Sequence, residues 1–128
     1  MTTNATPEGA SIIDGPNTTR ETTQGMLVIT PKGPSITESD STSVLAEVVG
    51  DVERSNGRVL LDMARVEYMS SAGISMLVQL REACANAGGS LAISGLASPI
   101  ASVLKTTKVD RLFTITKTRE KALAKLGD

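Results

Sequence analysis

The sequence predicts an α/β fold built on a mostly parallel sheet of four to five strands, with about four helices. Short apolar segments typical of strands alternate with segments whose apolar residues recur at helical spacing, in the order β, β, α, β, α, β, α, β, α. Parallel neighbours need a crossover helix, which packs on the sheet. A chain of 128 residues, 40% of them hydrophobic, suits a single core.

The N-terminal part predicts a tail followed by a hairpin. Residues 1–16 are rich in Thr, Pro, Gly, Asn and Ser, so we expect a flexible tail that only Ile12-Ile13 could attach to the body. The β-branched stretch 18–23 can pair across Gln24-Gly25 with a strand at 26–30.

The first helix follows a cluster of residues that interrupt regular structure, Pro31 to Ser35. Residues 37–40 supply hydroxyls and carboxylates suited to a helix N-terminus, and Asn56-Gly57 ends the helix. Its apolar positions at helical spacing are Val44, Leu45, Val48, Val49 and Val52. The segment from Arg58 to Met63 is short and mostly apolar, as a buried central strand should be.

A second helix is expected from Ala72 to Ala87, ended by Gly88-Gly89 and followed by a strand at 90–94. Its apolar residues cover an arc of about 220°, whereas packing on a sheet needs little more than about 100°. Another helix or a partner should therefore cover the apolar surface of this helix that the sheet leaves free. Cys84 lies within this apolar pattern and is interpreted as a core residue.

The C-terminal part predicts one more helix, a last strand and a closing helix. Ser98 is expected to cap the third helix, with Pro99 at the first helical position. The segment 112–116 has the pattern of a last strand, and Thr118 is expected to cap a closing helix that carries Ala122 and other apolar residues.

The composition excludes several classes of function. Without histidine and with one cysteine, the chain offers no His-based triad, disulfide framework or ordinary zinc site, so we expect no enzyme, no metal and no cofactor. A net charge of −1 and only two aromatic residues argue against direct nucleic-acid binding, and the seven bases from Lys105 onward are interpreted as a solvated face. No apolar run suits a membrane span or a signal segment, so we expect a cytoplasmic protein with no membrane contact.

The segment "YMSSAG", residues 68–73, places two hydroxyls where a strand turns into a helix. Such a serine most often caps the helix, for roughly 1 kcal/mol, but capping needs only one of them. Ala72-Gly73 leaves the other serine uncrowded, and a helix N-terminus favours an anion such as a phosphoryl group. In parallel sheets, ligands and partners meet the loops at the carboxyl ends of strands, where this segment is expected.

The segment "LLDMARVEYMSSAGISMLVQLREACANAGGSLAISGLASPIASVLKTTKVDRLFTIT" resembles the core of a STAS domain, the fold of bacterial anti-sigma factor antagonists. Its most specific part is "MSSAGISML", which is similar to the family's strand-end motif of Asp or Ser, then Ser, then Ser, Thr or Ala, then Gly and an aliphatic residue. The similarity extends over residues 17–126, which implies a STAS fold there after the tail 1–16.

By this match, Ser71 falls on the serine that a partner kinase phosphorylates, and Ser70 is the second choice. Two positions depart from the family pattern: Ser70 stands where many members carry Asp, and the loop 33–36 lacks the acids of the family's Gly-Glu-Leu-Asp-like loop. The resemblance implies a partner-binding surface made of Ser35, Ile36, Met69, Ser70, Ala72, Gly73, Ile74 and Met76.

The resemblance thus implies an anti-sigma factor antagonist that binds an ATP-binding serine-kinase anti-sigma factor in a partner-switching pathway. Phosphorylation at Ser71 would inactivate it, and a phosphatase acting on phospho-Ser71 would reverse this. The alternative is a non-phosphorylated STAS scaffold or an accessory subunit of a transporter ATPase, in which Ser71 is only a cap. An enzyme with a serine nucleophile is disfavoured, because no Ser-x-x-Lys or Gly-x-Ser-x-Gly motif surrounds Ser70 or Ser71.

Overall fold

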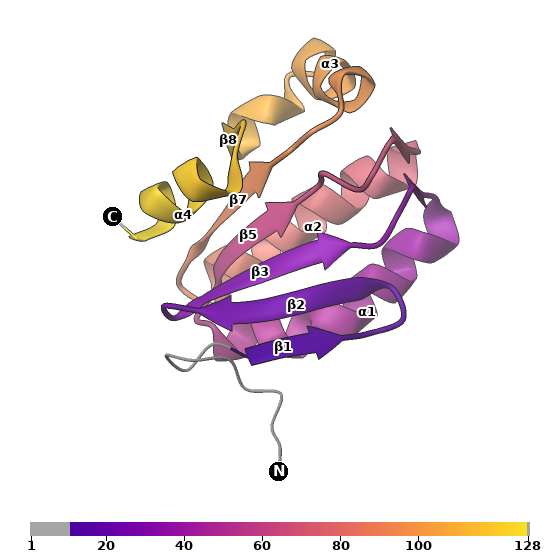
Figure 1. Cartoon of the computed structure of the whole chain (residues 1–128). Coiled ribbons are helices and arrows are strands. Elements are labelled where there is room, and N and C mark those ends of the chain that lie inside the picture. The colour runs from indigo at the N-terminus through magenta and orange to yellow at the C-terminus, as the bar shows by residue number, and fades with distance from the viewer. Residues whose placement is uncertain (1–10, 128) are drawn as a thin grey trace.

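The structure is a computed structural model that describes residues 11–127 (Figure 1). It contains a six-stranded sheet in the order β1-β2-β3-β5-β7-β8 and a two-stranded sheet of β4 and β6. The first three strands pair antiparallel and the others parallel, so the sheet is mixed and mostly parallel as predicted, with six strands instead of four to five. The strands are β1 (Ser11–Asp14), β2 (Thr18–Thr23), β3 (Met26–Pro31), β4 (Ser35–Ile36), β5 (Arg58–Asp62), β6 (Tyr68–Met69), β7 (Ser90–Ser94) and β8 (Thr114–Thr116).

Helices cover both faces of the main sheet. Helices α1 and α2 pack side by side on one face, and α4 lies on the other face over β5 and β7 (Figure 1). Part of the predicted excess of apolar surface on the second helix therefore packs against α1. In the described residues the helices are α1 (Glu38–Arg54), α2 (Ser71–Asn86), α3 (Ser98–Thr106), the short 3₁₀ helix η2 (Val109–Leu112) and α4 (Arg119–Gly127).

Strand β1 lies inside the segment expected to be a flexible tail, so that prediction was wrong for residues 11–14. Ile12 pairs with Glu21 and Ile13 with Arg20 in an antiparallel ladder. Both isoleucines stay about half exposed, so backbone pairing rather than burial holds this edge strand. Residues 1–10 of the expected tail lie outside the described residues.

The core consists of two clusters because successive strand residues point to opposite faces of the sheet. Leu27 and Leu61 belong to the larger cluster under α1 and α2, whereas Val28 and Leu60 pack with Ala122 of α4. Cys84 is buried in the larger cluster, and burial raises the pKa of its thiol to about 12. Its interpretation as a core residue is confirmed.

Some element ends differ from the prediction. Helix α3 begins at Ser98, so Ala97 and not Ser98 occupies the cap position. The last strand is shorter than predicted, because the chain forms η2 up to Leu112 before it extends. The hydroxyl of Thr118 accepts a hydrogen bond from the Lys121 amide at 3.2 Å, which confirms the predicted cap of the closing helix.

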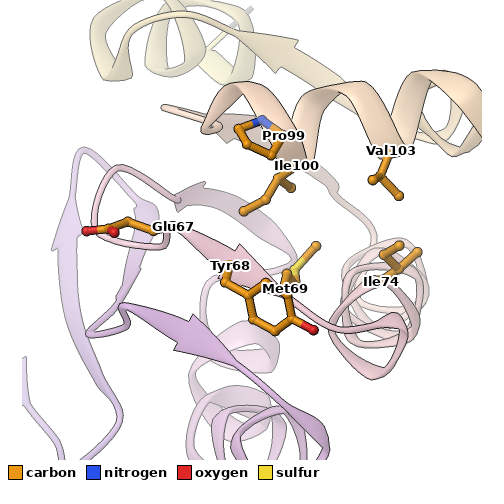
Figure 2. A pocket seen from close by; sticks show the side chains of 7 residues that line it. All are labelled: Glu67, Tyr68, Met69, Ile74, Pro99, Ile100 and Val103. Carbon is orange, nitrogen blue, oxygen red and sulfur yellow. The ribbon is translucent and has the colours of Figure 1, made fainter.

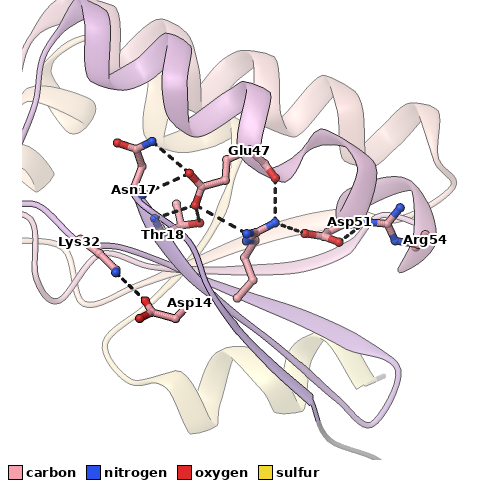
Figure 3. A network of polar contacts seen from close by, with 8 residues as sticks. Asp14, Asn17, Thr18, Lys32, Glu47, Asp51 and Arg54 are labelled. Atoms are coloured by element: carbon pink, nitrogen blue, oxygen red, sulfur yellow. Dashed lines mark hydrogen bonds and ion pairs between the residues drawn. The ribbon is translucent and has the colours of Figure 1, made fainter. Parts of the chain in front are cut away.

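A polar network fixes α1 against the N-terminal hairpin (Figure 3). The Glu47 carboxylate accepts hydrogen bonds from the backbone amide and hydroxyl of Thr18, at 3.0 and 2.6 Å, and from the Asn17 side chain at 3.0 Å. One turn on, Arg20 donates to Asp51 at 2.5 Å. Burial by itself would raise the pKa of Glu47, but the hydrogen bonds from Thr18 and Asn17 outweigh it and hold the pKa below its usual value.

We expect Glu47→Gln to lower the unfolding free energy at pH 7 by about 1–3 kcal/mol, because a neutral amide cannot accept all of these hydrogen bonds. The lowered pKa means that the carboxylate stabilises the fold above its unfolded pKa of 4.5, and that this contribution is lost as the pH falls through the folded value. Urea unfolding at several pH values should therefore show the deficit of the variant shrinking below about pH 4.5.

The matched control is Glu53→Gln, on an exposed position of the same helix. It should change the unfolding free energy by less than about 0.5 kcal/mol. Equal losses for the two variants at pH 7 would contradict the role assigned to the network.

Candidate functional site

The candidate site lies where β4 and β6 pair at the carboxyl ends of β3 and β5. Their register places Ser35 beside Tyr68 and Ile36 beside Met69. The amide of Ser70 extends the ladder by donating to the Ile36 carbonyl at 3.0 Å. The predicted partner-binding residues from two distant segments are thus brought together at the start of α2.

Gly73 lets this small sheet pack closely on α2. A Cβ atom at this position would lie 2.0 Å from Met69 Cγ and 3.4 Å from Ile36 Cγ2. A larger residue would therefore have to displace the Met69 side chain from the first turn of the helix. The glycine of the motif serves packing here.

The two serines of the motif have different surroundings. Ser71 is the first residue of α2 and is exposed. Ser70 occupies the cap position, but its hydroxyl makes no cap hydrogen bond; the Oγ atom is buried and has no partner within residues 11–127. The first turn is closed by the Ser70 carbonyl, which accepts from the amides of Gly73 at 2.9 Å and Ile74 at 3.3 Å. Ser71 is thus not the cap, and it is the exposed residue of the pair.

Burial corrects part of the predicted partner-binding surface. Met76 is fully buried in the larger core cluster, and Ile36 and Gly73 are buried as well, so direct contact of these residues with a partner was a wrong prediction. They face inward because α2 turns these positions toward the sheet and the β4–β6 pair. The predicted residues that keep some exposure are Ser35, Met69, Ser70, Ala72 and Ile74.

Ser71 lies beside a shallow hollow between α1 and α2 that Glu38, Thr42 and Ser75 also line. The first turn of α2 carries neither an acidic nor a basic side chain. Glu38 is therefore the charged side chain in this hollow, among the described residues. No group of three or more His, Cys, Asp or Glu side chains in residues 11–127 is placed to hold a metal ion.

On the other side of the same turn, an apolar groove of about 140 Å³ separates β6 and α2 from α3 (Figure 2). Sequence reasoning missed most of this groove, because α3 lies far along the chain from the motif. Tyr68, one of two aromatic residues in the sequence, was the available signal. The residues that line this "α3 groove" are Glu67, Tyr68, Met69, Ile74, Pro99, Ile100 and Val103.

Comparison with known proteins identifies the family. The model of the STAS domain matches residues 17–122. The chain belongs to the STAS domain family. A relative from Bordetella bronchiseptica, named "Putative anti-sigma factor antagonist BtrV", is 26% identical over 106 residues, which cover 83% of this chain and 90% of that protein.

Solved structures of STAS proteins share the fold. A crystal structure from Thermotoga maritima, described in the same terms as BtrV, has a TM-score of 0.77 at 17% identity and covers 85% of this chain and 93% of its own. The Bacillus cell fate determinant SpoIIAA in its phosphorylated form has a TM-score of 0.59 at 13% identity. The match covers 91% of this chain and 97% of the SpoIIAA chain. None of the helices between residues 11 and 127 has the length and apolarity that crossing a bilayer requires.

We expect Ser70→Ala to change the unfolding free energy by less than about 0.5 kcal/mol, because its hydroxyl makes no hydrogen bond that the substitution could remove. A serine acting as a cap would instead lose about 0.5–2 kcal/mol. Thermal and urea unfolding would measure the difference.

Thr37→Ala is the comparison at the start of α1, where the Thr37 hydroxyl does donate, to Asp40 Oδ2 at 2.8 Å. This variant should lose about 0.5–1 kcal/mol. A larger loss for Ser70→Ala than for Thr37→Ala would show that Ser70 caps α2 after all.

Proposed function

We propose that this STAS protein is an anti-sigma factor antagonist, which binds a serine-kinase anti-sigma factor and is inactivated when that kinase phosphorylates Ser71. The observation that carries the proposal is the exposed Ser71 hydroxyl at the first position of α2, next to the buried Oγ of Ser70. The similarity to BtrV, named "Putative anti-sigma factor antagonist", and to SpoIIAA, which is known in a phosphorylated form, supports it. The protein acts as a non-enzymatic regulator in a partner-switching pathway.

The fold should tolerate a phosphoryl group at Ser71. The group adds about two negative charges at a helix N-terminus, where unpaired amides and the helix dipole favour an anion. Glu38 in the same hollow opposes it, but both groups stay hydrated while the surface is free. Modification is therefore compatible with the folded, unbound protein.

A partner covering the same turn changes this balance. Binding would remove water from the phosphate and press it against a surface suited to a neutral hydroxyl, so the phosphorylated form loses affinity through desolvation and repulsion. No change of fold is needed. A phosphatase that removes the group from the exposed position restores binding.

Incubating the purified chain with its cognate kinase and ATP should place phosphate on Ser71, as mapped by mass spectrometry. Ser71→Ala should abolish labelling. Ser75→Ala, which removes another exposed serine one turn further along α2, should leave labelling unchanged. Phosphate on Ser70, Ser75 or elsewhere would contradict the assignment of the phosphoacceptor.

Ser71→Asp should weaken binding of the cognate kinase by about tenfold or more, because it buries a carboxylate in the interface. Asparagine has the shape of aspartate without its charge. Ser71→Asn should therefore bind the kinase within about threefold of the wild type. Calorimetric titration measures both.

The rival function is a non-phosphorylated scaffold or an accessory subunit of a transporter ATPase. In that case Ser71→Ala and Ser71→Asp should both leave function intact. Pull-downs with and without ATP should then recover scaffold or transport components and no kinase.

A further inference from the structure

The α3 groove is a second feature of the surface around Ser71. Its floor is formed by Met69, Ile74 and the largely buried Ile100. Two large apolar side chains stand at its rim: Tyr68 is 60% exposed and Val103 is 45% exposed. In Figure 2, Ile100 and Val103 of α3 face Tyr68 and Met69 across the hollow. Exposed apolar side chains gathered around a hollow mark an interaction site more often than scattered ones do.

The groove and Ser71 belong to one continuous surface. Ile74 follows Ser71 by three positions in α2, and residues at that spacing are neighbours on a helix surface. Met69, on the other wall, lies just before Ser70 in the chain. A protein segment that extends beyond the groove along the first turn of α2 therefore reaches Ser71, which lines the hollow on the other side of that turn.

The negative charges around the groove indicate what kind of protein segment would bind in it. Glu67 is the one charged residue among those that line it in the described structure, and it forms no salt bridge with any residue from 11 to 127. Glu38, in the hollow on the other side of Ser71, likewise has no salt bridge there. An occupant with a cation beside its apolar group would complement these carboxylates.

The same charge disfavours a second copy of this chain. In a twofold-symmetric contact both copies present the same patch, so the partner copy would bring the carboxylates of its own Glu67 and Glu38 and no cation from this patch to pair with them. The volume of the groove, about 140 Å³, is close to that of cavities that accept a single benzene-sized group. One side chain of leucine or phenylalanine size fits it.

We propose that the α3 groove is the anchor pocket for the kinase, receiving one large apolar side chain from a segment that also places a lysine or arginine beside Glu67. This inference rests on the proposed function and extends the docking surface onto α3. The anchored segment covers Ser71, which gives the desolvation on which the phosphorylation switch depends. Binding energy is then concentrated in a central apolar pocket, as at other protein interfaces.

The central test is Val103→Arg, which fills the rim of the groove with a charged side chain. Its matched control is Val49→Arg, on an apolar position of α1 that is 50% exposed and lies outside the groove. Titration calorimetry with the purified cognate kinase should show affinity reduced about tenfold or more for Val103→Arg and less than about twofold for Val49→Arg. Equal affinities for the two variants would overturn the proposal.

Two further measurements keep the test independent of folding defects. In wild-type protein labelled at isoleucine methyl groups, kinase should shift the NMR signals of Ile74 and Ile100 while leaving Ile13 unchanged. Glu67→Gln should lower the association rate and its salt dependence, whereas Glu53→Gln should change neither. Unshifted Ile74 and Ile100 signals at saturating kinase would overturn the proposal.

The outcomes separate this inference from the function on which it rests. If Ser71 is phosphorylated but Val103→Arg binds like the wild type, only the anchor pocket is wrong. If the wild type does not bind the kinase, both proposals fail. If sedimentation shows a wild-type dimer that Val103→Arg dissociates, the occupant is a second copy and the assignment to the kinase is overturned.

Discussion

The parallel pairing of β4 with β6 is the constraint on which the candidate site depends. These strands join the loop after β3 to the loop before α2, and the amides of Glu67 and Tyr68 reinforce the junction by donating to the Pro34 carbonyl at 2.6 and 3.1 Å. Backbone groups make all of these bonds, so the bonds themselves do not depend on side-chain identity. The β4–β6 junction fixes the direction in which the chain enters α2. It thereby determines which of the two serines is exposed.

Charge is distributed unevenly between the body of the fold and the site. Four ion pairs of the described residues hold the hairpin to α1 and α4 to the sheet, where Arg119 binds Asp62 at 3.0 Å and Glu21 at 3.4 Å. On either side of Ser71, Glu67 in the α3 groove and Glu38 in the hollow form no salt bridge with any residue from 11 to 127. The ion pairs that join the elements of the fold thus involve neither Ser71 nor these two carboxylates.

The Ser-Ser pair illustrates how a local motif acquires two roles. The Ser70 backbone carbonyl closes the first turn of α2, while its hydroxyl is enclosed and unpaired. The next residue, Ser71, is exposed at the same helix end, where an anion is favoured. Glu38 and Glu67 supply acidic groups in the hollows on either side of this turn.

The sequence alone determined the alternation of strands and helices, the position of the motif and the fate of Cys84, because apolar periodicity and local turn chemistry are encoded within short segments. Only the tertiary structure decided that Met76 is buried, since the face of α2 that turns inward depends on how α1 and the sheet pack around it. Likewise, strand β1 forms through pairing with β2 and not through its own composition. Tyr68 and Val103 share a groove for the same reason: contacts between segments distant in sequence arise from packing of the completed fold, which no local pattern records.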